Sequence, residues 1–86
     1  MQELIQIPKY PAEHAALTKA VDAAGGQTAL ASKLGRGVRQ AKIWTWLNRD
    51  SRCGATYVLD IERVTGISRH ELRPDIYPVE LTGDAA

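Results

Sequence analysis

A polar stretch near the middle of the chain, residues 40–45, carries side chains suited to contacts with DNA bases. It supplies an amide, a small methyl group, an ammonium group, an indole and a hydroxyl, from Gln40, Ala41, Lys42, Trp44 and Thr45. A glutamine amide can bind adenine through two hydrogen bonds, and a lysine ammonium can bind guanine or a phosphate. A helix with such groups on one side is suited to the major groove. We therefore predict base contacts from these five residues.

Two of the five residues have a second interpretation. Ala41 can touch a thymine methyl group, but an alanine is as often a neutral helix residue. Trp44 can lie against the sugar–phosphate backbone or pack at the edge of the core, and the sequence favours neither. Trp46, two positions further on, is expected in the core.

Basic side chains are concentrated around the same stretch. Residues 33–52 contain six Lys and Arg against one Asp, whereas residues 53–86 contain three Arg against six acidic side chains. Most charge runs are solvated faces, but this one coincides with the polar stretch, and a DNA-binding surface needs such a concentration. We expect phosphate contacts from Lys33, Arg36, Arg39, Arg49 and Arg52.

Other chemistry has little support in the sequence. There is no nucleophile–base pair and no glycine-rich phosphate loop, so we do not expect an enzyme. The single cysteine, Cys53, lies far from His14 and His70, so we expect no metal site, no cofactor and no internal disulfide. Cys53 is interpreted as an incidental loop residue. The absence of a membrane-length apolar run and of a leader favours a cytoplasmic location.

Two short helices are predicted to position the polar stretch. Leu30, Ala31 and Leu34 form one apolar helical face, and Gly35 follows at the position where a helix commonly stops. A second helix is expected to begin at Val38, with its back formed by Val38, Ile43, Trp46 and Leu47. Together they predict a helix-turn-helix.

Three further helices complete the expected fold. An apolar stripe predicts a first helix that begins between Ala12 and Leu17 and ends at Gly25-Gly26. After an irregular loop at residues 48–54, a fourth helix is expected over residues 55–65. Its expected core residues are Val58, Leu59 and Ile61, and its stop is Gly66. Ser68 and Glu71 match a reciprocal capping box that opens a fifth helix, which Pro74 closes; His70, within that box, is interpreted as structural.

The chain is accordingly expected to be all-α, a compact bundle of five short helices in one domain at residues 12–78. Residues 1–11 alternate in the manner of a strand and then carry two prolines. They are compatible with an arm, an edge strand or a disordered lead-in. Residues 79–86 are expected to form a tail.

Three segments carry a resemblance to a known family. They are LTKAVDAAGGQTALASKLG (residues 17–35), IWTWL (residues 43–47) and IERVTG with SRHELRPDIYP (residues 61–66 and 68–78). They resemble the λ-repressor-like helix-turn-helix superfamily of the Cro/CI type. Within it, the chain is similar to the YdaS-like group of prophage-borne Cro-like regulators and antitoxins.

The resemblance implies a sequence-specific transcriptional regulator, a Cro/CI-like repressor whose third helix reads double-stranded operator DNA. It implies that Gln27 binds phosphate at the start of the second helix, with Thr28 beside it, and that Gln27 braces Gln40. The alternative is an antitoxin-type module that binds a partner protein, with or without regulation of its own DNA. The acidic last third of the chain would suit a basic partner.

The turn departs from the family pattern. Arg36-Gly37 are two extra residues, and Arg39 stands where a small hydroxyl residue usually caps the third helix. A longer turn could shift the third helix, and loss of the cap should cost on the order of 1 kcal/mol.

A homodimer is also expected, because one recognition helix contacts too few base pairs to locate a site in a genome. The segment 70–81 is the candidate contact. Leu72 and Ile76 are expected to pack back onto the fourth helix, so the dimer rests mainly on Val79 and Leu81.

Overall fold

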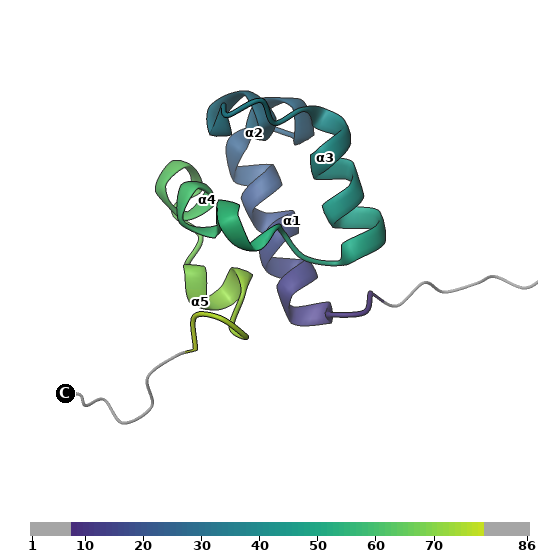
Figure 1. Ribbon diagram of the computed structural model, residues 1–86, viewed down its shortest axis with the longest axis vertical. Helices are drawn as coiled ribbons and strands as arrows, with labels where there is room; N and C mark the ends of the chain where they lie inside the picture. Colours follow the sequence, from purple (N-terminus) through teal and green to yellow (C-terminus); the bar gives the residue numbers. More distant parts are fainter. Residues whose placement is uncertain (1–7, 79–86) are drawn as a thin grey trace, which may run out of the picture.

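Helices account for most of residues 8–78, the part of the chain that the computed structural model describes. No strand is present in this part, so the all-α prediction is confirmed. In chain order the segments are α1 (Pro11–Ala24), α2 (Gln27–Leu34), α3 (Gln40–Thr45), the π-helical turn η1 (Trp46–Asp50), the 3-10 turn η2 (Ala55–Tyr57), α4 (Val58–Thr65) and α5 (Arg69–Leu72). Figure 1 shows α2 across the upper end of α1, with α3 on one side of α1 and α4 and α5 on the other.

The longest helix, α1, forms the centre of the core. It begins at Pro11, one residue before the expected window, because proline fits the first helical position, where no backbone N–H is needed. Its apolar stripe is buried along the whole helix, at Ala16, Leu17, Ala20, Val21 and Ala24. The helix ends as predicted at Gly25, whose φ of 104° is left-handed and whose N–H donates to Val21 and Asp22 carbonyls.

The helix-turn-helix forms as predicted, with one change at its second helix. Leu30, Ala31 and Leu34 are buried on α2, and Ile43 and Trp46 are buried behind α3, with Leu47 partly buried. However, α3 begins at Gln40, not at Val38. Val38 is buried within the turn instead, where its N–H donates to the Gly35 carbonyl over 3.0 Å.

The prediction of an irregular loop from residue 48 is wrong at its start. The helical path of α3 continues through η1 to Asp50. The side-chain amide of Asn48 donates to the Trp44 carbonyl over 3.0 Å, which supplies one of the local bonds that this continuation needs. The path stops at Ser51, a buried residue with a left-handed φ of 65°.

The fourth helix is shorter than expected. Residues 55–57 form the turn η2, and α4 proper begins at Val58. Val58 and Ile61 are fully buried, but Leu59 is 46% exposed, so its predicted core position is wrong. Val58 and Ile61 are three residues apart and share a helical face, whereas Leu59 is turned away from it. Gly66 ends the helix with a φ of 82° and donates to the Glu62 carbonyl, as predicted.

The predicted Ser68 cap of α5 is confirmed, but the predicted reciprocal capping box with Glu71 is wrong. The Ser68 hydroxyl accepts from the His70 N–H over 3.0 Å, not from Glu71. The Glu71 carboxylate instead accepts from the Lys19 ammonium on α1, 3.0 Å away. Leu72 ends the helix and is fully buried, as expected, whereas Ile76 is 44% exposed, so the expectation that it packs inward is wrong. Val79 and Leu81 lie outside the described residues.

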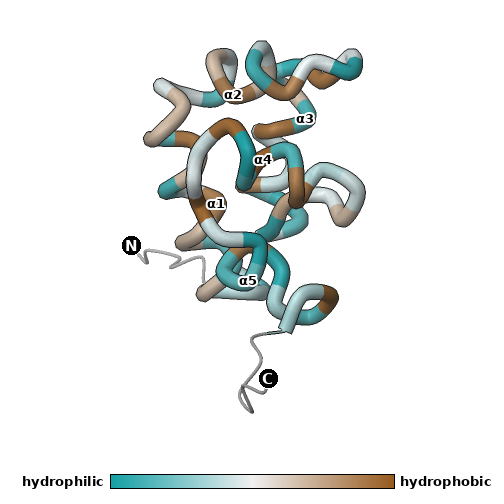
Figure 2. Tube along the Cα trace, turned by 90° about the vertical axis from the view of Figure 1, so that its left-hand side faces the viewer, coloured by the Kyte–Doolittle hydropathy of each residue, from teal (hydrophilic) through white to brown (hydrophobic). Residues whose placement is uncertain are grey.

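A buried charge joins α5 to the loop after η1. The guanidinium of Arg73 donates to the Cys53 carbonyl over 2.9 Å and to both oxygens of Asp75. The hydrogen bonds from Arg73 to Asp75 hold the pKa of Asp75 down, at about 2. Figure 2 shows hydrophobic and hydrophilic segments alternating along the helices, in keeping with one shared core. Within residues 8–78 no helix is long and apolar enough to cross a membrane.

Candidate nucleic-acid interface

The outward face of α3 carries the residues predicted to read bases. Gln40, Ala41, Lys42 and Trp44 are exposed, and Thr45 is partly buried. Trp44 is 51% exposed, so it is not part of the buried core, and its contact with DNA stays a prediction. Ile43 and Trp46 anchor the opposite face, so the helix presents a polar front on a rigid apolar back.

A hydrogen bond joins the first residues of α2 and α3. The Gln40 Nε2 donates to Gln27 Oε1 over 2.6 Å, which is the brace that the family resemblance implied. A glutamine amide has two N–H groups and one carbonyl. After the brace, one N–H and the carbonyl of Gln40 remain, which are the two groups that a bidentate adenine contact uses.

The hydroxyl of Thr45 is partly committed within the helix. It donates to the Ala41 carbonyl over 3.0 Å, so only its oxygen lone pairs remain for an outside partner. Thr45 is therefore suited to accept from a base amino group or water, and not to donate.

The side chain of Arg36 points to α4. Its guanidinium donates to the Asp60 carboxylate and to the Thr56 carbonyl, 3.3 Å away, and lies 4.7 Å from the centre of the Tyr57 ring. The hydrogen bond from Arg36 lowers the pKa of Asp60. The extra residues of the turn are thus tied to α4, and a phosphate contact from Arg36 would compete with these bonds.

Arg52 is also engaged within the domain. Its guanidinium stacks 3.7 Å from the centre of the Tyr10 ring, and it lies 3.6 Å from Asp75 and 4.0 Å from Glu13. Only 22% of its side chain is exposed. Its phosphate contact stays a prediction, one that would require this cluster to open.

The remaining predicted phosphate contacts lie at the surface. Thr28, Lys33, Arg39 and Arg49 are exposed, and Gln27 is partly buried at the first position of α2. Arg39 precedes α3 in an extended conformation and its side chain makes no cap bond, so the expected loss of the cap is confirmed. The structure therefore brings Gln27, Gln40 and the α3 face together and directs Arg36 and Arg52 elsewhere.

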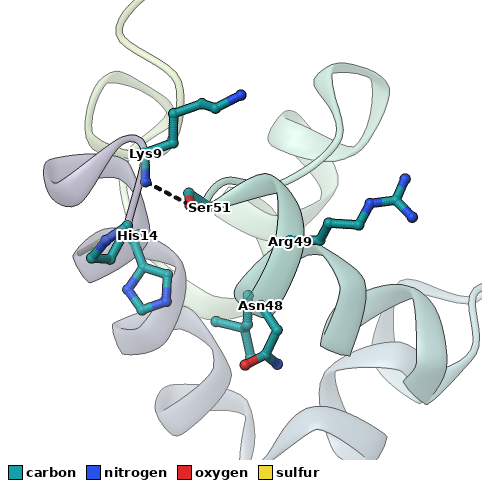
Figure 3. A pocket seen from close by; sticks show the side chains of 7 residues that line it. Lys9, His14, Asn48, Arg49 and Ser51 are labelled. Atoms are coloured by element: carbon teal, nitrogen blue, oxygen red, sulfur yellow. Dashed lines mark hydrogen bonds between the residues drawn. The ribbon is translucent and has the colours of Figure 1, made fainter. Parts of the chain in front are cut away.

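A pocket that the sequence did not reveal lies where the chain enters α1 and leaves η1. It measures about 340 Å³ and is lined by Pro8, Lys9, His14, Leu47, Asn48, Arg49 and Ser51. Figure 3 shows the Lys9 N–H donating to Ser51 Oγ across it, over 3.0 Å. The only indication in the sequence was that Asn48 lies four residues after Trp44, a spacing that places both residues on the same side of a helix.

Groups able to bind a metal do not gather in the described residues. No cluster of three or more His, Cys, Asp or Glu occurs within residues 8–78. Cys53 is 1% exposed, and burial raises the pKa of its thiol to about 11. The thiol is thus held protonated and is a poor nucleophile.

Comparison with known proteins places most of the chain in one family model. A family model described as "Bacterial toxin YdaS" matches residues 17–81. No curated protein and no solved structure matches the chain.

Proposed function

The chain belongs to the bacterial YdaS toxin family, and within that family we propose that it acts as a sequence-specific DNA-binding regulator. The observation that carries this proposal is the exposed polar face of α3, braced at its first residue by Gln27. A side chain held in one orientation before binding loses less conformational entropy when it pairs with a base. A braced glutamine is therefore better suited to reading a base than a mobile one.

Electrostatics support the same proposal. Lys33, Arg39 and Arg49 are exposed on or beside the two helices of the helix-turn-helix. Cations at such places neutralise phosphates and release counterions, which supplies most of the sequence-independent affinity for DNA. Asp60 and Asp75 neutralise Arg36 and Arg52 within the domain, so the positive charge left to attract DNA is that of Lys33, Arg39, Lys42 and Arg49.

We further propose that the regulator acts as a homodimeric repressor of Cro/CI type. Two-fold symmetry would place two copies of α3 about 34 Å apart, in successive major grooves. The exposed side chain of Ile76, just after α5, supports a contact through the C-terminal part of the chain. The other proposed contacts, Val79 and Leu81, lie outside the described residues.

The description of the family supports a second candidate function. It names a toxin, whereas the sequence suggested an antitoxin-type module. We therefore propose, as the alternative, that the chain impairs bacterial growth by binding a partner protein. A toxin that acts through DNA would instead need the same α3 face as the regulator.

Titration of a mixed-sequence duplex at several salt concentrations tests the proposed function. We expect binding at micromolar protein or below, with an affinity that falls steeply as salt rises. Binding that is absent, or independent of salt, would overturn the proposal. Induced expression in bacteria separates the two candidates. Growth arrest by the wild type that persists in Gln40→Ala/Lys42→Ala would favour the protein partner, and arrest lost in that variant would favour DNA.

A further inference from the structure

The pocket between the start of α1 and the end of η1 has the composition of an anion site. Lys9 and Arg49 bring two cations, and His14, Asn48 and Ser51 bring further polar groups. Among the described residues that line it there is no carboxylate. Figure 3 shows the Lys9, Asn48 and Arg49 side chains extending in different directions from the pocket, so binding one anion together requires these exposed side chains to turn towards it. A small-molecule site would have a mainly apolar lining, but only Pro8 and Leu47 are apolar here.

The wall of this pocket is fixed by a bond between distant parts of the chain. The Lys9 N–H donates to the hydroxyl of Ser51, a buried residue in a left-handed conformation. This bond holds the segment before α1 against the last turn of η1. Lys9 is therefore positioned beside Asn48 and Arg49 even though some 40 residues separate them in sequence.

The pocket continues the reading face of α3. Gln40, Trp44 and Asn48 are spaced four residues apart, so they follow one side of the helical path, and Asn48 is bonded to the Trp44 carbonyl. Eight residues of helix span about 12 Å, and the major groove of DNA is also about 12 Å wide. If Gln40 meets base edges inside the groove, the pocket then reaches the groove's edge, where the phosphates run.

We propose that this pocket binds one backbone phosphate of DNA, through Lys9 and Asn48 together with the already predicted Arg49. The inference rests on the proposed function and adds Lys9 and Asn48 to the interface. The C-terminal end of a helix carries about half a negative charge, which two full cations exceed. Arg49 lies 3.7 Å from Asp50, but its side chain is 77% exposed. Such a surface pair is weak and yields readily to a phosphate.

The salt dependence of DNA affinity tests the pocket. We expect Lys9→Gln to reduce the slope of log affinity against log salt by about one unit, because one phosphate contact is lost. Asn48→Ala should weaken binding to all sequences alike by several fold and leave the salt slope unchanged, since it removes a neutral donor. Because it also removes the bond from Asn48 to the Trp44 carbonyl, circular dichroism must show that its helix content equals that of the wild type. The control is Lys19→Gln, which removes the same charge from an exposed site on α1 that faces Glu71. A slope that falls equally in Lys9→Gln and Lys19→Gln, or in neither, would overturn the inference.

Two measurements distinguish a failure of this inference from a failure of the proposed function. If the wild type binds duplex in a salt-dependent manner and Lys9→Gln behaves like it, the pocket fails and the function stands. Inorganic phosphate, titrated against the wild type alone and followed by NMR, tests the pocket without DNA. Saturable shifts at Lys9, Asn48 and Ser51, lost in Lys9→Gln, support a phosphate site. If those shifts appear while DNA affinity is unchanged in Lys9→Gln, the pocket binds free phosphate, and the assignment to the DNA backbone is overturned.

Discussion

The side-chain amide of Gln40 donates to the side-chain carbonyl of Gln27 over 2.6 Å, which joins the first residue of α2 to the first residue of α3. The bond orients the Gln40 amide before DNA arrives. It also couples two residues with different proposed partners, a phosphate for Gln27 and a base for Gln40.

Replacing Gln27 should therefore weaken the preference for the base that Gln40 contacts. We expect Gln27→Ala to lower preference at that base pair and to show a coupling energy with Gln40→Ala of about 0.5–3 kcal/mol in DNA binding. Ser32→Ala, an exposed change on the same helix, serves as the control. The measurement is a double-mutant cycle on one bound duplex. Strictly additive effects would mean that the brace has no part in recognition.

The clamp from Arg36 to α4 should stabilise the fold. A cation against the Tyr57 ring contributes about 0.5–1 kcal/mol, so Arg36→Ala should lower the melting temperature by about 2–8 °C. Arg39→Ala removes a neighbouring exposed arginine without that contact and should leave the melting temperature nearly unchanged. Thermal unfolding by circular dichroism gives both values. Unchanged stability in Arg36→Ala, together with a lower salt slope for DNA, would instead identify Arg36 as a phosphate contact.

These residues show how far the sequence alone could go. The spacing of Leu30, Ala31 and Leu34, and of Ile43 and Trp46, was enough to predict both helices and the exposed front of α3, because helical periodicity is local. The brace from Gln27 was accessible only through the family resemblance. Whether the front of α3 contacts DNA stays a prediction.

Sequence patterns were insufficient where a side chain contacts residues far away in the sequence. Glu71 matched a capping box, but Lys19, far away in sequence, takes its carboxylate. Nothing in the sequence indicated that Asp60 and Tyr57 lie beside Arg36, and its phosphate contact stays a prediction. The pocket around Lys9 depends on the bond to Ser51, which local patterns cannot indicate.

Stability should fall in acid through Asp75. Its pKa is about 2 in the folded protein, chiefly because Arg73 donates to it, against an ordinary value of 3.8. The folded state therefore binds this proton less readily than the unfolded chain, so the stabilisation is complete above about pH 4 and is lost towards pH 2. Urea unfolding between pH 2 and pH 5 should show this slope in the wild type. Asp75→Asn should flatten it, while Asp22→Asn, at an exposed site on α1, should not. An equal slope in all three proteins would contradict the assignment.

The thiol of Cys53 should be unreactive in the folded protein. With a pKa of about 11, only about one thiol in a thousand is ionised at pH 8. Burial adds a steric barrier, since the residue is 1% exposed. We expect an aromatic disulfide reagent to label the native protein at least 100-fold more slowly than the urea-unfolded chain. Equal labelling rates would mean that the loop after η1 opens readily.

Selection of bound duplexes from a random-sequence pool is the most direct measurement of sequence-specific reading by α3. We expect the wild type to enrich one consensus, with two related half-sites if the protein is a dimer. Gln40→Ala and Lys42→Ala should each lose preference at one base pair, at a cost of about 1–3 kcal/mol there. Lys19→Gln should enrich the wild-type consensus. No consensus from the wild type, or an unchanged consensus from both α3 variants, would contradict the proposal that this helix reads the DNA sequence.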